Sequence, residues 1–378
     1  MVLTLLSASR LVRAQSQGDL LVFFGTYTNN SSSKGIYVSR LDSNTGALSA
    51  PELAAETRSP SFLAVHPTRD FLYCVNEVND FQGEKTGSVS AFALDRKTGM
   101  LNLINQQSSA GTGPAHIVTD RAGRNVLVAN YGGGSVAVLP IDNSGGLRRA
   151  SSTIQHSGSS VNKQRQSAPH AHSINVDPTD RFAYVADLGL DKVFIYRLDA
   201  SAGSLSANTP RFADVEPGSG PRHFALHPDG RLAYVINEMT CTVTAFRRDP
   251  STGSLTPLQT VSTLPEGQTV AKGFSTAEVQ VHPSGRLLYG SNRGHDTIVV
   301  FTIDEETGRV SLLQHEPTQG STPRNFGIDP GGRYLLAANQ RSDSIVVFRI
   351  DAKTGRLSPT EHRVQVGAPV CVKFARSN

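Results

Sequence analysis

The sequence contains no tryptophan and only three cysteines among its 378 residues. Without tryptophan it cannot carry the Trp-Asp signature of the most common protein-interaction repeats. The cysteines, Cys74, Cys241 and Cys371, have no metal-ligand spacing, and their number is odd. We therefore expect buried free thiols rather than a metal site or a disulfide framework.

Excess charge and long apolar runs are also lacking. The 36 basic and 32 acidic residues leave a formal net charge of +4, and the basic residues are dispersed rather than clustered with aromatics. This distribution argues against nucleic-acid binding. No apolar stretch suits a transmembrane helix, so we expect neither a nucleic acid nor a membrane as a partner. No amphipathic helix is apparent, and the abundant glycine and proline indicate an all-β protein rich in turns.

The first 17 residues differ in character from the rest. The stretch from Met1 to Leu6 is weakly apolar, but Arg10 and Arg13 follow it instead of preceding it. A signal peptide has positive charge before an apolar core of about seven residues or more. We expect residues 1–17 to be either a disordered leader or a truncated export signal, with a single domain over residues 18–378. A cytoplasmic location is favoured, and export is the alternative.

A sevenfold internal repeat dominates the remaining sequence. In each repeat a strand ends in Asp or a near equivalent, and a Thr-Gly, Ser-Gly or Ala-Gly turn follows. The turn glycines are Gly46, Gly99, Gly145, Gly203, Gly253, Gly308 and Gly355. Their separations are 53, 46, 58, 50, 55 and 47 residues. A period near fifty with several short strands per unit is typical of a propeller blade.

A second landmark sets the register within each repeat. It is a tight turn beginning with His or Asp: His66-Pro67, Asp120, Asp177-Pro178, His227-Pro228, His282-Pro283 and Asp329-Pro330. Asn or Asp follows ten residues later in every case. Alternating apolar runs on both sides of the turn predict a β-hairpin, and two further runs complete four antiparallel strands.

Six landmarks against seven turns leave one blade incomplete. The segment from Leu20 to Thr26 resembles a second strand, and the segment from Pro369 to Phe374 resembles an innermost strand. We predict that the two ends complete one blade together, which leaves no open sheet edge. The predicted fold is an all-β, seven-bladed propeller of four-stranded antiparallel blades, one of them closed by N- and C-terminal strands.

The blade pattern also predicts a pocket. In a hairpin, the start of the first strand and the end of the second lie at the same edge, so both face one end of the central channel. His, Arg and Glu are concentrated there, although strand propensity would not select them. Polar groups that converge on a concavity are the default candidate site. The candidate catalytic residues are His172, Arg222, Glu238 and Arg293, because most other blades carry unrelated residues at these positions. The candidate substrate-binding residues are His170, His116, His223, Glu77 and Arg324.

Other polar residues recur from blade to blade and are expected to be structural. They are the landmark histidines His66, His227 and His282 and the Asn found ten residues after the turn. His170 alternates with His172, so we expect both on one side of a strand, one acting and the other orienting it or the substrate. The loop from Ser157 to Ala168 lengthens this repeat, either as a flap over the channel or as a solvated insertion.

Five motifs resemble those of a known family. They are Pro169-His170-Ala171-His172-Ser173, Asp187-Leu188-Gly189, Gly220-Pro221-Arg222-His223, Asn237-Glu238 and Ser291-Asn292-Arg293-Gly294-His295-Asp296. They are similar to the motifs of the lactonase family of seven-bladed propellers, which holds bacterial 6-phosphogluconolactonases and fungal 3-carboxy-cis,cis-muconate lactonizing enzymes. The resemblance spans Phe23 to Phe374. It implies a pocket His, two Arg and a Glu, which map onto His172 (or His170), Arg222, Arg293 and Glu238.

The same side chains suit lactone hydrolysis. Glu238 or a pocket His can take the proton from water. One Arg can hold the developing oxyanion, and another can pair with a phosphate or carboxylate. We expect a lactone hydrolase of the pentose phosphate route that acts on 6-phospho-D-glucono-1,5-lactone, as a monomer or weak homo-oligomer with no cofactor.

Three alternatives remain open. A lactonizing cycloisomerase of the carboxymuconate type uses related chemistry in reverse, and a binding propeller would lack catalysis. A calcium-dependent lactonase would need several converging oxygen ligands. The candidates for such a site are Glu77, Glu238, Glu278, Asn237 and Asn292, but the interleaved arginines argue against it, so we expect no metal.

Overall fold

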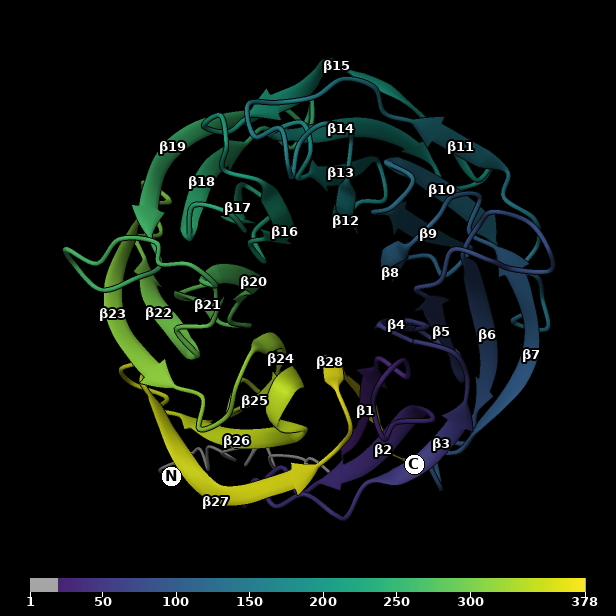
Figure 1. The fold of residues 1–378 in the computed structure, drawn as a ribbon, viewed down its shortest axis with the longest axis horizontal. Coiled ribbons are helices and arrows are strands. Elements are labelled where there is room, and N and C mark those ends of the chain that lie inside the picture. The colour runs from purple at the N-terminus through teal and green to yellow at the C-terminus, as the bar shows by residue number, and fades with distance from the viewer. Residues whose placement is uncertain (1–19, 378) are drawn as a thin grey trace, which may run out of the picture.

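Residues 20–377 are described by the computed structural model, and in this range the chain forms seven four-stranded antiparallel sheets. The sheets stand as blades around a central channel (Figure 1). The predicted seven-bladed propeller is therefore confirmed. The leader predicted at residues 1–17 lies outside the described residues.

Each blade runs from an innermost strand at the channel to an outermost strand at the rim. In that order, the first blade contains β28 (Pro369–Arg376), β1 (Leu20–Thr26), β2 (Gly35–Leu41) and β3 (Glu52–Glu56). The second contains β4 (Phe62–Val65), β5 (Phe71–Asn76), β6 (Ser88–Leu94) and β7 (Leu101–Ser108). The third contains β8 (Pro114–Thr119), β9 (Asn125–Asn130), β10 (Ser135–Pro140) and β11 (Ser152–Gln155). The fourth contains β12 (Ala171–Val176), β13 (Phe182–Asp187), β14 (Lys192–Asp199) and β15 (Ser204–Asp214). The fifth contains β16 (Pro221–Leu226), β17 (Leu232–Asn237), β18 (Thr242–Arg248) and β19 (Leu255–Ser262). The sixth contains β20 (Ser275–Val281), β21 (Leu287–Arg293), β22 (Thr297–Ile303) and β23 (Val310–Pro317). The seventh contains β24 (Pro323–Ile328), β25 (Tyr334–Asn339), β26 (Ser344–Ile350) and β27 (Leu357–Gln365), with the short 3₁₀ turn η1 (Gln340–Ser342) after β25.

The first blade joins the two ends of the described chain. Strand β28 pairs antiparallel with β1, and Phe23 lies opposite Lys373 in this register. The C-terminal strand thus supplies the innermost position, and the N-terminal strands supply the outer three, as the sequence predicted. This pairing closes the ring with main-chain hydrogen bonds, so no unpaired edge is left at the junction.

Contacts between blades explain why the turn glycines recur. The buried Tyr184 in β13 donates its hydroxyl to the carbonyl oxygen of Gly253 in the next blade, at 2.9 Å. Tyr289 makes the equivalent bond to Gly355 at 2.8 Å. Gly253 has a φ of +74°, and a Cβ there would lie 2.5 Å from the ring of Phe182. Only glycine satisfies both the backbone conformation and this close approach.

The landmark residues are structural, as predicted. His227 in the fifth blade shares a hydrogen bond between Nε2 and the carbonyl oxygen of Gly285 in the sixth, at 2.7 Å. Where Asp replaces His, the carboxylate of Asp177 accepts main-chain hydrogen bonds from Arg181 and Phe182. The buried Asn residues ten positions later bind neighbouring strands and loops through their side-chain amides.

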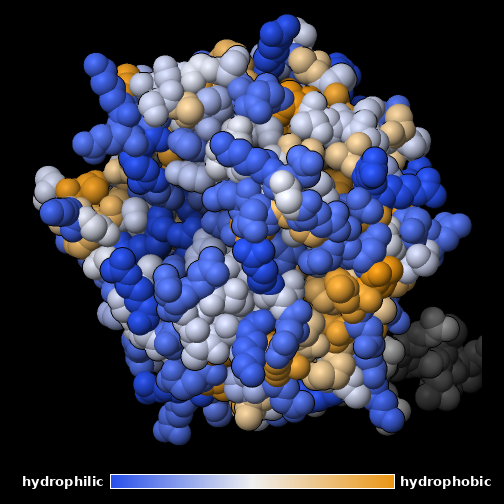
Figure 2. Space-filling view, turned by 45° about the vertical axis from the view of Figure 1, so that its right-hand side comes forward, coloured by the Kyte–Doolittle hydropathy of each residue, from blue (hydrophilic) through white to orange (hydrophobic). Residues whose placement is uncertain are grey.

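The cysteines, the helical structure and the surface can be described for residues 20–377. All three cysteines are free and buried, as expected. None of the helical structure in this range is long and apolar enough to cross a membrane. The face seen in Figure 2 is largely hydrophilic, with smaller apolar areas.

Candidate functional site

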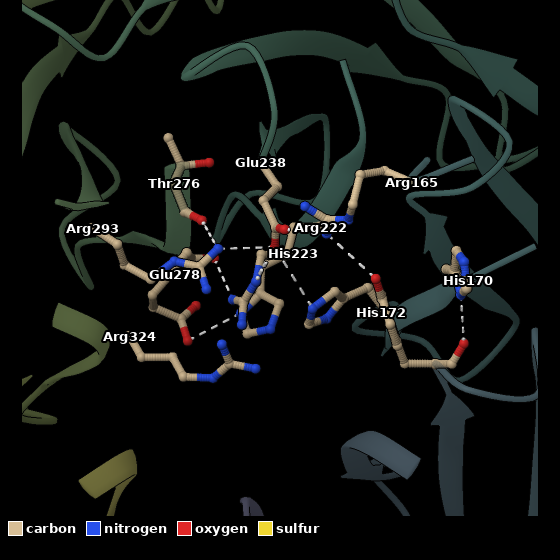
Figure 3. A network of polar contacts seen from close by, with 12 residues as sticks. Arg165, His170, His172, Arg222, His223, Glu238, Thr276, Glu278, Arg293 and Arg324 are labelled. Carbon is tan, nitrogen blue, oxygen red and sulfur yellow. Dashed lines mark hydrogen bonds and ion pairs between the residues drawn. The ribbon is translucent and has the colours of Figure 1, made fainter. Parts of the chain in front are cut away.

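Four predicted catalytic residues meet at one end of the channel (Figure 3). His172 and Arg222 lie near the starts of the inner strands β12 and β16, whereas Arg293 ends β21 and Glu238 directly follows β17. The hairpin argument from the sequence places them at the same edge, and their contacts agree with that placement.

Glu238 is the centre of the site. Its Oε2 accepts hydrogen bonds or ion-pair contacts from Arg222 at 3.1 Å and Arg293 at 2.9 Å. Its Oε1 contacts a third guanidinium, that of Arg165, at 2.6 Å. The main chain of Glu238 is fixed as well, because its N–H donates to Gly220 O at 2.7 Å. The carboxylate therefore acts as a shared anchor for three cations from three parts of the chain.

The charge state of Glu238 follows from these partners. Burial by itself would raise the pKa of this carboxyl, but Arg293, Arg222 and Arg165 outweigh burial and lower the pKa to about 2. For Arg222, burial and the nearby charges of Arg324 and Arg293 lower the pKa to about 9. Both groups are thus charged at neutral pH, and Glu238 is a poor proton acceptor.

His172 is buried beside this cluster with a neutral imidazole. Burial and the positive charge of Arg222 hold the pKa of His172 well below its ordinary value of 6.5. Its Nε2 lies 4.0 Å from Oε2 of Glu238. Its Nδ1 is buried and has no hydrogen-bond partner within the described part of the chain. A neutral imidazole with an unused nitrogen, close to a fixed anion, is suited to accept a proton.

Deeper in the channel lies a second polar pair that the sequence did not predict. His223 Nδ1 is 3.2 Å from Glu278 Oε2, and Asn325 donates its side-chain amide to the same oxygen. Burial raises the pKa of Glu278 to about 7, although Lys373 and Arg222 act in the opposite direction. The sequence suggested Glu278 only as a calcium ligand. Its signal was its position, because Glu278 and His223 stand at the same distance before their landmark turns.

The remaining predicted binding residues occupy two different places. His116 packs against His223, with ring centroids 5.3 Å apart, so it lies deep in the channel. Glu77 and Arg324 meet instead at Tyr27, whose hydroxyl donates to Glu77 Oε2 at 2.8 Å and accepts from Arg324 at 2.9 Å. The sequence missed Tyr27, although it follows β1 just as Glu77 follows β5. The composite blade has no landmark turn before β1, and this concealed the correspondence.

His170 lies apart from the residues that contact Glu238. It precedes β12, and a β-bulge between Ala171 and Ser173 interrupts the alternation that the sequence suggested. The ring of His170 stacks on Tyr131 at 4.6 Å, and its Nδ1 lies 3.0 Å from the Tyr131 carbonyl oxygen. His172 contacts the same Tyr131 ring, at 5.0 Å. The two histidine rings are therefore linked through Tyr131, and the expectation that one acts while the other orients it or the substrate stays a prediction.

Two voids along the channel differ greatly in size. At the arginine end, a void of about 10 Å³ is lined by residues including His172, Arg222 and Arg324. At the opposite end, a cavity of about 470 Å³ is lined by residues including Glu278, Gln280 and Lys373. Phe62 and His223 line both voids and lie between them. The pocket that the sequence predicted at the arginine end is therefore narrow, and Arg222, which lines it, is held in an ion pair with Glu238.

The oxygen ligands suggested for calcium do not converge. Glu77 binds Tyr27, Glu238 binds three arginines, and Glu278 binds His223 and Asn325. Within residues 20–377, no group of three or more His, Cys, Asp or Glu side chains is arranged to hold a metal ion.

Comparison with known proteins agrees with the fold. The family described as "Lactonase, 7-bladed beta-propeller" matches residues 21–374. The chain is 35% identical to a 6-phosphogluconolactonase of Bacillus subtilis, over 93% of this chain and 97% of that protein. It is 34% identical to a 6-phosphogluconolactonase of Formosa agariphila, over 81% of this chain and 86% of that protein. The solved structure of a periplasmic gluconolactonase of Pseudomonas aeruginosa superposes with a TM-score of 0.89 at 33% identity, covering 96% of this chain and 100% of that one. The chain therefore belongs to the lactonase family of seven-bladed β-propellers.

Proposed function

We propose that this protein hydrolyses 6-phospho-D-glucono-1,5-lactone to 6-phosphogluconate, a step of the pentose phosphate pathway. The observation that carries the proposal is the convergence of arginines at one end of the channel, around Glu238 and beside a neutral histidine. Two relatives named 6-phosphogluconolactonase, which match most of the chain, support the same reaction.

The charge balance of the arginine end suits an anionic substrate. Four arginines, which we call the arginine cluster, surround two glutamates: Arg165, Arg222, Arg293 and Arg324 around Glu77 and Glu238. Two positive charges are left without a carboxylate in this group. A phosphorylated sugar lactone supplies negative charge there, and guanidinium groups match phosphate geometry with paired hydrogen bonds.

The hydrolysis can be assigned to the side chains of this end. His172 accepts a proton from water as the water oxygen attacks the lactone carbonyl carbon. A cluster arginine stabilises the negative charge that develops on the carbonyl oxygen. The bond from the carbonyl carbon to the ring oxygen then breaks, and the protonated His172 returns its proton to that oxygen. Glu238, 4.0 Å from His172, stabilises the imidazolium in between.

Substrate entry requires some cluster contacts to exchange, because the void between His172, Arg222 and Arg324 is only about 10 Å³. The ion pairs with Glu238 occupy the position of a bound anion. A substrate phosphate can replace the carboxylate as the partner of a guanidinium without leaving that cation unpaired.

A coupled assay tests the proposal directly. Freshly prepared 6-phosphogluconolactone and glucono-1,5-lactone are each mixed with the protein, and spontaneous hydrolysis is subtracted. We expect a rate that is proportional to protein concentration, with the higher kcat/KM on the phosphorylated lactone. Rates equal to the spontaneous ones for both lactones would refute the proposed function. Activity on the neutral lactone alone would reject the phosphate preference.

A further inference from the structure

The loop from Ser157 to Ala168 is held by hydrogen bonds near both of its ends. Near one end, the Ser160 hydroxyl donates to Asp191 at 2.6 Å. Near the other, the fully buried Gln166 donates its side-chain amide to the Leu188 carbonyl oxygen at 2.9 Å. Between the ends, Asn162 Oδ1 accepts main-chain N–H groups and shapes a tight turn. The loop therefore holds its tip in a defined place.

That place is the mouth of the arginine end. Arg165 reaches from the loop to Glu238 Oε1 at 2.6 Å and to the Tyr131 hydroxyl at 3.4 Å (Figure 3). Its side chain is 44% exposed, whereas those of Arg222 and Arg293 are 3% and 13% exposed. Of the three arginines bound to Glu238, Arg165 is thus the one that keeps substantial contact with solvent.

The solvent exposure of each arginine determines which guanidinium a phosphate group can bind with the smallest loss of its hydration. A phosphate group is strongly hydrated, and complete burial of its charge is expensive. At the mouth it can keep part of its hydration while it gains paired hydrogen bonds from an arginine. The uncharged lactone ring is the part of the substrate that can enter more deeply, toward His172 and Arg222.

The contacts of Glu238 make Arg165 exchangeable. Arg222 and Arg293 both bind Oε2, whereas Arg165 binds Oε1. If Arg165 turns away, two guanidinium groups still neutralise the carboxylate. Release of Arg165 therefore does not leave a buried unpaired charge, which is the costly event in breaking a buried ion pair.

We propose that Arg165 is a specificity-determining residue, which leaves Glu238 to bind the phosphate group of the substrate at the mouth of the channel. This inference rests on the proposed function, because it assigns a residue to the phosphate of that same substrate. It interprets the loop from Ser157 to Ala168 as a functional flap rather than a plain insertion.

Kinetics on two lactones test the assignment. In Arg165→Ala, we expect KM for the phosphorylated lactone to rise about tenfold or more relative to KM for glucono-1,5-lactone. Arg165→Lys should restore part of the preference, since it keeps the charge but not the paired geometry. Lys163→Ala is the matched control, because it removes an exposed charge from the same loop and should keep the wild-type preference. An equal change on both lactones, or no change, would overturn the role of Arg165.

Equilibrium binding separates this inference from the proposed activity. By titration calorimetry, 6-phosphogluconate should bind the wild-type protein more tightly than gluconate, and Arg165→Ala should remove most of the difference. If wild type shows this difference but hydrolyses neither lactone, the proposed function fails and the role of Arg165 in phosphate recognition stands. If Arg165→Ala keeps the full difference, the role of Arg165 fails, whatever the catalytic result.

Discussion

Arg222 donates a hydrogen bond from Nε to Oε2 of Glu238 at 3.1 Å, and the two side chains are only 3% and 8% exposed. The NH1 group of Arg222 also donates to the carbonyl oxygen of Ala277, at 2.7 Å. Such a doubly bound, buried guanidinium is fixed in direction before any substrate arrives. This supports the proposal that Glu238 orients the arginines and that His172 is the proton acceptor.

Replacement of Arg222 should affect the chemical step. In Arg222→Ala, we expect kcat to fall by on the order of a hundredfold for both the phosphorylated and the neutral lactone, since an oxyanion forms in both reactions. Steady-state kinetics with both lactones measures this. Thermal denaturation is the control for folding, because removal of one partner from a buried pair is destabilising. A rise in KM confined to the phosphorylated lactone would assign phosphate binding to Arg222 instead.

The pH dependence of the rate should identify the base. Burial and Arg222 hold the pKa of His172 well below 6.5, so kcat/KM should decline only at a pH well below 6.5, where His172 becomes protonated. His172→Ala should reduce kcat by roughly 10²–10⁴-fold and remove this acidic limb. Glu238→Gln removes the anion that favours the imidazolium, so it should move the limb to still lower pH. Complete loss of the limb in Glu238→Gln would make Glu238 the base.

Glu278 should make stability depend on pH in the neutral range. Its pKa is raised by burial from 4.5 to about 7, so the folded state favours the protonated form. The resulting stabilisation is fully present below the unfolded pKa and is lost as the pH rises through 7. The melting temperature of wild type should therefore decline between about pH 4.5 and 7 more than that of Glu278→Gln. Parallel curves for the two proteins would contradict the raised pKa.

One hydroxyl contact between blades can be tested without touching the site. Tyr289→Phe removes the hydrogen bond to the Gly355 carbonyl oxygen, which measures 2.8 Å in wild type. We expect the free energy of unfolding to fall by about 1–3 kcal/mol, since a buried acceptor loses its donor. Denaturant titration gives this value, and kcat and KM should stay at wild-type levels. An unchanged free energy of unfolding would show that water replaces the tyrosine donor.

Chelation addresses the calcium alternative. The carboxylates at the arginine end are bound to protein groups, namely Glu77 to Tyr27 and Glu238 to arginines. We expect EDTA treatment followed by dialysis to leave the lactonase rate unchanged. Loss of activity that Ca²⁺ restores would require a metal-dependent mechanism and a different arrangement of these side chains.

The site could be predicted in part because the repeat shows which positions of successive blades are equivalent and therefore face the channel at the same level. Arg222, Glu238 and Arg293 were recognised because they are charged residues at channel-facing positions where most other blades carry unrelated residues. Glu278 and Tyr27 were missed for different reasons. Glu278 was considered only as a metal ligand, and Tyr27 belongs to the blade that has no landmark turn before β1.

The architecture of this protein follows from signals that are local in the sequence. Blade number, strand order and the joining of the two ends were predicted from apolar alternation and turn residues, which depend on near neighbours in the chain. The turn glycines and landmark histidines carry that information because each blade packs on the next in the same way.

The filling of the site depends instead on contacts that exist only in the folded chain. Arg165 has no counterpart in other blades, and it meets Glu238 across 73 positions of sequence. No periodic pattern can predict such a contact, because it depends on where the ends of a single loop are anchored. The same holds for the ion pairs around Glu238. Those pairs depend on side-chain geometry and charge in three dimensions.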